Sequence, residues 1–498
     1  MTFRTERDPL GQLNVPADAY YGVQTMRAVE NFRISELRAP FDLVTATILI
    51  KKAAAESNRD LGRLDAPVAK AIVSAADEIL SGRLRDQFVV DAYQAGAGTS
   101  HNMNANEVLA NRAAELLGEP RGTYKRVHPN DHVNMGQSTN DVYPAATRLA
   151  LLLGHRRLAD AARDLVDALE RKAQEFAGVI KTGRTHLQDA VPMTLGQEFG
   201  GYAACVQRGT ADIEYASTEL LELNLGATAV GTGLNAGDDY RRTVIDYLRQ
   251  YTGLNLRTAD NLFRVTQSMG DVLAYSSAMR RLAIEVGKIA NDLRLLSMGP
   301  RAGLSEIALP AVQPGSSIMP GKVNPSVPEM VNQVCFQVIG CDTTVAMACE
   351  AGQLELNVMM PVIAWNALHS SSILQHAMNT LRLLTIEGIV ADADRARELL
   401  DRSTAAATAL SPYIGYVATA EIAKEAVKTG KSIRHVVLTK GLLSEKQLDE
   451  ILSVEKMTRG GVTGKQMTRR AGGAGRAAMA GQRAQTAPST PARKKRSR

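Results

Sequence analysis

Residues 272–297 read VLAYSSAMRRLAIEVGKIANDLRLLS, and this stretch decides the fold class. Its apolar side chains step by four and three residues along the chain, which places them on one face of a long helix. The members of this stripe are Leu282, Val286, Ile289, Leu293 and Leu296.

Apolar periodicity of the same kind recurs elsewhere, and leucines repeat every seven residues from Leu151 to Leu165. Short β-branched runs bounded by turns, which are typical of strands, are few. Sustained three-and-four spacing over five helices of about twenty residues predicts an all-α chain with a long antiparallel five-helix bundle at its centre. The other periodic ranges are 43–56, 68–80, 203–223, 330–349 and 366–384.

The composition is that of a soluble globular protein with more than one domain. The chain has 498 residues, of which 45% are hydrophobic and 22% are charged. Aromatic residues are only 4%, which disfavours a nucleic-acid module that stacks bases. Four cysteines without a CxxC pair disfavour a disulfide framework or a structural zinc site. Without a signal peptide or an apolar run long enough to span a membrane, we expect a cytoplasmic protein.

The net charge of +6 comes entirely from one end of the chain. Residues 459–498 contain eleven Lys and Arg and no Asp or Glu, whereas the other 47 basic residues face 52 acidic ones. A segment of Gly, Ala, Arg, Thr and Pro cannot bury enough apolar surface to order itself. We therefore predict a disordered basic tail over 459–498, and we leave open a weak, salt-sensitive contact between this tail and nucleic acid.

Changes of pattern divide the rest of the chain. Residues 1–140 are predicted to form a mostly helical N-terminal domain, and residues 141–393 the central domain of long helices. Beyond residue 393 the long periodicity gives way to shorter helices, so 394–458 are predicted to form a small C-terminal helical domain.

Polar segments rich in Gly, Asn and Thr lie between the periodic ranges, where loops at the ends of rigid helices often carry chemistry. The most informative is GSSIMPGKVNP over 315–325, which combines two serines, flexible glycines, one lysine and one asparagine. Lys322 would supply charge and Asn324 a directional donor for a carboxylate substrate. A solvated turn remains the alternative from these residues alone.

This segment resembles the signature loop of the aspartase/fumarase superfamily. The resemblance extends over roughly residues 5–455 and leaves only the basic tail outside. The further matching motifs are VPADAYYGVQT (15–25), AGAGTSHNMNANEVLANR (95–112), HPNDHVNMGQSTND (128–141), GRTHLQDAVPMTLGQE (183–198), NLGATAVGTGLN (224–235) and GPRAGLSEI (299–307).

Local choices within these motifs resemble the aspartase branch more than the class II fumarase branch. They are the Tyr20–Tyr21 pair, Thr139, and EAGQLELNVMMPVI over 350–363. The resemblance implies reversible anti elimination of ammonia from L-aspartate to give fumarate. The alternative is a class II fumarate hydratase that interconverts malate and fumarate on the same scaffold. A non-catalytic binding protein with a basic tail is disfavoured because the motif residues are intact, namely Ser316, Lys322, Asn324 and His186.

By resemblance, Ser316 is the base, and closure of its loop, the Lys322 ammonium and backbone N–H groups favour its alkoxide. The reaction needs donors on the carboxylate that becomes a dianionic enolate, or aci-carboxylate. Ser316, His186 and Lys322 are the implied catalytic residues, and Glu329 would orient His186. The implied substrate-binding residues are Thr99, Ser138, Thr139, Asn140, Thr185, His186, Ser317, Lys322 and Asn324. No metal site and no required cofactor are implied, and activation by Mg²⁺ is left open.

The motif loops are far apart in sequence, and a straight bundle holds its helix ends at distant points. One chain therefore cannot easily gather residues 99, 139, 186 and 316 around one substrate. The resemblance implies a homotetramer with a twenty-helix core, in which three subunits build each active site.

Overall fold

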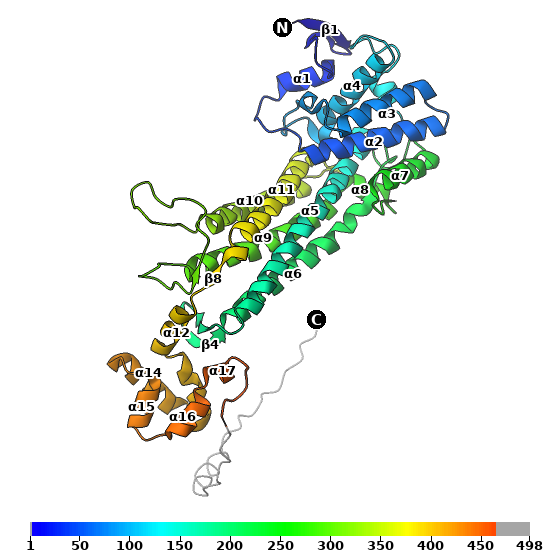
Figure 1. Cartoon of the computed structure of the whole chain (residues 1–498). Coiled ribbons are helices and arrows are strands. Elements are labelled where there is room, and N and C mark those ends of the chain that lie inside the picture. Colours follow the sequence, from blue (N-terminus) through cyan, green and yellow to red (C-terminus); the bar gives the residue numbers. More distant parts are fainter. Residues whose placement is uncertain (1, 465–498) are drawn as a thin grey trace, which may run out of the picture. The chain divides into compact units, whose positions relative to one another are not determined.

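The computed structural model describes residues 2–464, which form two compact units (Figure 1). Within the described residues, the first unit comprises 2–179 and 194–396, and the second comprises 180–193 and 397–464.

The N-terminal part of the first unit, residues 3–116, contains four helices and a β-hairpin. Apolar faces of its second, third and fourth helices form a core of their own, in which Ile48, Ile72 and Leu109 are fully buried. The hairpin strands are antiparallel, with Phe3 opposite Pro16. The elements are β1 (Phe3–Asp8), β2 (Gly11–Pro16), α1 (Val23–Asn31), α2 (Phe41–Asp60), α3 (Ala66–Leu80) and α4 (Thr99–Leu116).

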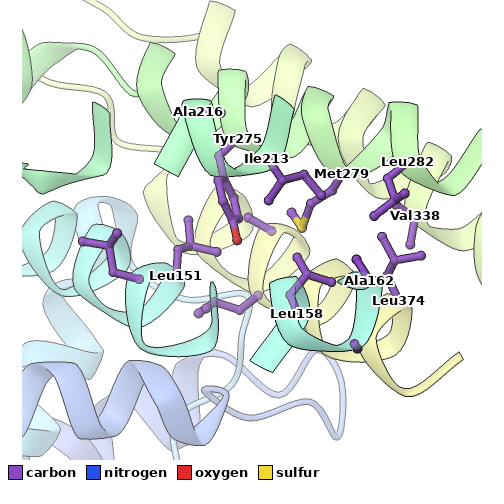
Figure 2. Packing of buried hydrophobic residues seen from close by; sticks show 14 of the residues in the cluster. Leu151, Leu158, Ala162, Ile213, Ala216, Tyr275, Met279, Leu282, Val338 and Leu374 are labelled. Carbon is purple, nitrogen blue, oxygen red and sulfur yellow. The ribbon is translucent and has the colours of Figure 1, made fainter. Parts of the chain in front are cut away.

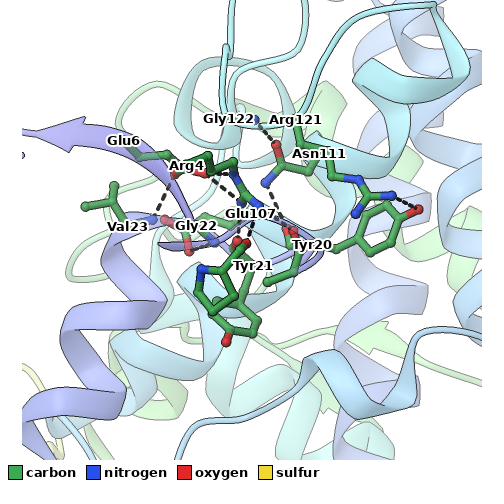
Figure 3. A network of polar contacts seen from close by, with 12 residues as sticks. Arg4, Glu6, Tyr20, Tyr21, Gly22, Val23, Glu107, Asn111, Arg121 and Gly122 are labelled. Atoms are coloured by element: carbon green, nitrogen blue, oxygen red, sulfur yellow. Dashed lines mark hydrogen bonds and ion pairs between the residues drawn. The ribbon is translucent and has the colours of Figure 1, made fainter. Parts of the chain in front are cut away.

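Two buried carboxylates, one on α4 and one on β1, hold the start of α1 (Figure 3). Glu107 of α4 accepts hydrogen bonds from the backbone N–H groups of Gly22, Gln24 and Thr25 and from the Thr25 hydroxyl. Glu6 of β1 accepts the N–H of Val23 at 2.9 Å. The orphan donors at the start of α1 are thus satisfied by acidic side chains from other elements.

Five long helices form the bundle of the first unit. In Figure 2, Leu158, Met279, Leu282, Val338 and Leu374 meet between them. A Cβ added at Gly209 would lie 2.9 Å from Leu282 Cδ1, which shows how closely two of these helices approach. The five are α5 (Thr139–Glu175), α6 (Leu195–Ser217), α9 (Gly270–Leu296), α10 (Ser326–Glu350) and α11 (Met360–Leu384).

Shorter elements connect the long helices. The strand β5 (Glu222–Leu223) runs parallel to β6 (Arg257–Thr258), and β7 (Ile307–Ala308) runs antiparallel to β8 (Val390–Ala391). The helices α7 and α8 span Asp238–Thr252 and Leu262–Gln267. Five single turns complete this set: 3₁₀ turns at Arg85–Gln87, Gly96–Gly98, Glu219–Leu221 and Ile386–Gly388, and a π turn at Pro129–Val133. A longer 3₁₀ helix, Ala405–Leu410, belongs to the second unit.

The second unit contains a hairpin and small helices. Its apolar core includes Leu410, Ile422, Val437 and Leu448. The hairpin strands are β3 (Ile180–Thr185) and β4 (Gln188–Thr194), and α12 (Ala393–Arg402) begins in the first unit and ends in the second. The other helices are α13 (Ser411–Ile414), α14 (Tyr416–Thr429), α15 (Ile433–Thr439), α16 (Glu445–Ile451) and α17 (Val454–Met457).

The prediction of a mostly helical chain is confirmed. The stripe read from 272–297 lies on α9, and all five of its residues are buried. The periodicity predicted over 203–223 differs from the structure at its end, because α6 stops at Ser217 and the chain turns into β5. No helix within residues 2–464 combines the length and the apolar character that crossing a bilayer would take.

Three predictions about organisation are not tested by a single chain. The division into domains at 140 and 393 stays a prediction, although α5 begins at Thr139 and α12 at Ala393. The twenty-helix core of a homotetramer also stays a prediction. The predicted disordered tail falls almost entirely outside the described residues, which end at Gly464.

Replacing Leu158 by Ala tests the bundle core. This side chain is fully buried among the long helices, so we expect the free energy of unfolding to fall by about 2–5 kcal/mol. Leu116→Ala, at a leucine that is 41% exposed at the end of α4, serves as the control and should change stability far less. Equal losses in urea titrations of the two variants would contradict the packing described.

Candidate active site

The start of α4 carries Thr99, whose position depends on the glycine before it. Gly98 has φ +82°, and a Cβ there would lie 2.1 Å from the ring of Tyr143. Only glycine therefore lets α4 begin this close to α5. Thr99 is exposed at this helix start, whereas the next residue, Ser100, is buried.

The start of α5 carries three further predicted residues. Ser138 is the N-cap, and its hydroxyl accepts the N–H of Asn140 at 3.2 Å. The Thr139 hydroxyl accepts a hydrogen bond from Asn102 of α4 at 3.0 Å, so the starts of α4 and α5 lie side by side. Free N–H groups and the helix dipole make the first turn of a long helix favourable for an anion such as a carboxylate.

A buried polar layer lies beneath this helix start. The Lys51 ammonium donates to Asn134 Oδ1 at 2.8 Å and to Gln137 Oε1 at 2.9 Å. Burial lowers the pKa of Lys51 to about 7, against the opposing charge of Asp141. Burial, with the nearby Lys51 charge, likewise lowers the pKa of His101 to about 4. His101 is therefore a neutral interior residue that is hydrogen-bonded to Thr47 at 2.9 Å.

The 315–324 loop is closed by its own hydrogen bonds. The N–H of Gly315 donates to the Lys322 carbonyl at 2.8 Å, and the Asn324 amide donates to the Gly315 carbonyl at 2.7 Å. The hydrogen bond from the Asn324 side chain lies within the loop itself. The predicted contact of Asn324 with substrate therefore stays a prediction. Lys322 itself is exposed.

Ser316 directly follows Gly315 in this loop, and its hydroxyl oxygen accepts two backbone N–H groups. Its Oγ accepts the N–H groups of Ile318 at 3.2 Å and Met319 at 2.9 Å. Hydrogen bonds to the charged form of a group favour that form, so these two donors would favour an alkoxide if Ser316 lost its proton. The neighbouring side chains of Ser317, Ile318 and Met319 are exposed on the loop.

Thr185 and His186 belong to the second unit, in the hairpin of β3 and β4. His186 and Leu187 form its turn with φ +55° and +58°. Two consecutive left-handed residues make the tight turn that suits the twist of a hairpin, at a conformational cost because neither is glycine. The turn exposes the imidazole of His186.

The structure brings Thr99, Ser138, Thr139 and Asn140 together at two adjacent helix starts. Ser316, Ser317, Lys322 and Asn324 share one loop, and Glu329 lies half-buried in the first turn of the following helix, α10. The predicted contact between Glu329 and His186 stays a prediction.

Four residues that support the helix starts were not predicted from the sequence: Lys51, Asn102, Asn134 and Asp141. A signal was present: a lysine inside an apolar helical stretch, and asparagines at close spacing in SHNMNAN. Buried polar residues of this kind need partners, so they indicate a network. Among residues 2–464, no cluster of three or more His, Cys, Asp or Glu side chains is arranged to hold a metal ion.

Replacing Gly315 by Ala tests the loop closure. A Cβ at this position would lie 2.4 Å from the Lys322 carbonyl oxygen and 2.7 Å from the Asn324 nitrogen, so the closing hydrogen bonds cannot form. We expect turnover to fall at least about ten-fold, as for a loop that holds a proton-transfer group. Gly178→Ala, in the exposed turn after α5 with open space around it, is the control and should leave turnover unchanged. Normal turnover in Gly315→Ala would contradict a role for this closure.

Two family profiles together match most of the chain. The sequence profile described as Lyase matches residues 11–340, and the one described as Fumarase C C-terminus matches residues 407–459.

Individual relatives match almost from end to end. The aspartate ammonia-lyase of Bacillus subtilis (strain 168) is 48% identical over 93% of this chain and 98% of its own length. The aspartate ammonia-lyase of Escherichia coli (strain K12) is 50% identical over 91% of this chain and 96% of its own length.

Solved structures share the fold. The fumarate lyase:delta crystallin from Brucella melitensis, in its crystal structure bound to cobalt, has a TM-score of 0.88 at 52% identity and covers 92% of this chain and 100% of that one. The recombinant class II fumarase from Schistosoma mansoni has a TM-score of 0.89 at 37% identity, over 92% of this chain and 99% of that one.

Proposed function

The chain belongs to the lyase family of the aspartase/fumarase superfamily, and on that premise we propose that it eliminates ammonia reversibly from L-aspartate to give fumarate. The observation that carries this proposal is the match of 48–50% identity, nearly end to end, to proteins named aspartate ammonia-lyase. The match to a class II fumarase is weaker, at 37% identity.

In the proposed reaction, the Ser316 alkoxide removes a proton from the carbon next to one carboxylate. The electron pair moves onto that carboxylate as an aci-carboxylate, then forms the carbon–carbon double bond as the carbon–nitrogen bond breaks. The two N–H donors on Ser316 Oγ support this role, because they offset the cost of charging a hydroxyl. The amine leaves already protonated, so no strong general acid is needed.

Donors at the helix starts would hold the carboxylate that gains charge. Such donors act most strongly on charge that develops in the transition state. Thr99, Ser138, Thr139 and Ser317 take this task in the proposal. Lys322, Asn324 and Thr185 hold the other carboxylate, while Asn140 and His186 lie near the amino group and Glu329 orients His186.

A homotetramer with each site built from three subunits is part of the proposal. Exposed apolar side chains on the long helices support it, among them Phe336 at 67%, Met347 at 70% and Ile284 at 51% exposure. Large apolar surfaces on a bundle favour association with further copies. We also propose a cytoplasmic enzyme that requires no cofactor, with Mg²⁺ activation and contact of the basic tail with nucleic acid left to experiment.

The substrate assignment is tested by following fumarate absorbance. We expect L-aspartate to yield fumarate and ammonia without added cofactor, and L-malate to be turned over far more slowly. The reverse reaction should consume fumarate only when ammonia is supplied. Comparable or faster turnover of malate would replace this proposal with a fumarate hydratase.

Replacing Ser316 by Ala tests the base. Because the carboxylate-binding groups remain, we expect kcat to fall about 10²–10⁴-fold while a dicarboxylate inhibitor still binds. Lys322→Ala should instead weaken both binding and turnover, since it removes a positive charge that would stabilise the substrate carboxylate in both the ground state and the transition state. Ser81→Ala, at an exposed serine after α3, is the control. If Ser316→Ala kept more than about a tenth of kcat, another group such as His186 would be the base.

A further inference from the structure

Asp141 in the first turn of α5 has no assigned part in the reaction, yet it is buried directly behind the predicted carboxylate-binding residues. Its Oδ1 accepts the N–H of Ser138 at 2.9 Å. Its Oδ2 accepts the N–H groups of Gly226 at 3.0 Å and Thr228 at 2.9 Å. One carboxylate therefore joins the start of α5 to the glycine-rich loop that follows β5.

The same loop is also joined to the neighbouring Asn140. The Asn140 amide donates to the Ala229 carbonyl at 2.8 Å, and the Asn224 amide donates to the Asn140 carbonyl at 3.2 Å. Asn140 is thus bonded to 224–229 through both its side chain and its backbone carbonyl. Its orientation depends on this loop as well as on the helix.

Lys51 holds the other side of the helix start. It donates to Asn134 and Gln137, which precede Ser138, and it carries the charge opposite to that of Asp141. Burial raises the pKa of Asp141 to about 7 and lowers that of Lys51 to about 7, and each charge opposes the effect of burial on the other. An uncompensated charge in either place would be costly, and the opposite charge of the other residue lowers that cost.

We propose that Asp141 is a positioning residue: it fixes Ser138, Thr139 and Asn140 in the arrangement that a substrate carboxylate meets, with Lys51 as its buried counter-charge. This inference rests on the proposed function. Three N–H donors converge on Asp141, and a carboxylate can accept all of them. An asparagine offers one acceptor oxygen and turns a donor toward the rest, so the helix start would shift.

The test compares Asp141→Asn with Asp271→Asn. Asp271 is also buried and accepts hydrogen bonds from Arg148, but it bonds to none of residues 138–140. For Asp141→Asn we expect kcat to fall by about ten-fold or more, in the manner of a displaced transition-state donor, with a smaller rise in KM. For Asp271→Asn we expect a lower melting temperature with kcat within about two-fold of the wild type, in line with a structural role only.

The double variant Lys51→Met with Asp141→Asn is compared with Lys51→Met alone, because Lys51→Met also removes the hydrogen bonds to Asn134 and Gln137. Removing the lysine removes the uncompensated buried charge, so the melting temperature should recover relative to Asp141→Asn. The three N–H donors still lack their carboxylate, so kcat should stay well below that of Lys51→Met alone. If Asp141→Asn alone does not fold, these two variants carry the kinetic comparison.

Two results would overturn the proposal. One is a kcat of Asp141→Asn, or of the double variant, within two-fold of the wild type. The other is an activity loss that follows the melting temperature equally in the Asp141 and Asp271 variants, which would leave only a structural role. A wild type that acts on malate and not on aspartate would refute the proposed function instead, and the same comparison would then be made with malate.

Discussion

Pairing of the polar groups at the half-buried start of α5 is the constraint on which the site depends. The first turn of a helix leaves N–H groups without intrahelical partners, and these groups need other acceptors where water does not reach them. Ser138 and Asp141 satisfy them from within the helix start, and Lys51 and Asn102 pair the groups around it. The requirement for pairing therefore fixes the same backbone that presents Thr139 and Asn140.

The loop around Ser316 follows a different logic. It depends on a few hydrogen bonds between its own two ends, through Gly315, Lys322 and Asn324, and its apolar side chains are exposed. A segment with little buried apolar area opens at low cost in free energy. The helix starts are thus held by many hydrogen bonds, whereas the loop that carries Ser316, the base in the proposed reaction, is held by few.

The helical fold could be predicted from the sequence because the spacing of apolar residues indicates which side chains are buried. The Leu282–Leu296 stripe could only be satisfied by a helix with one buried face, and α9 has that face. The polar layer was not readable in this way. A lysine at position 51 looks like an exposed residue until Asn134 and Gln137, more than eighty residues away, are known to surround it. The predicted site residues came from motif resemblance, and spacing alone gave no distance between Thr99 and Thr139.

The fastening of the N-terminal residues has a consequence for shortened forms of this chain. Glu107 accepts four hydrogen bonds from Gly22, Gln24 and Thr25. A shortened chain that began after Thr25 would lack all four of these hydrogen bonds. Burial already raises the pKa of Glu107, so a bare carboxylate there would take up a proton or draw water into α4. That helix also carries Thr99 at its first turn. A chain that lacked these N-terminal residues would keep every predicted site residue. It would nevertheless lose the hydrogen bonds to α4, the helix that presents Thr99.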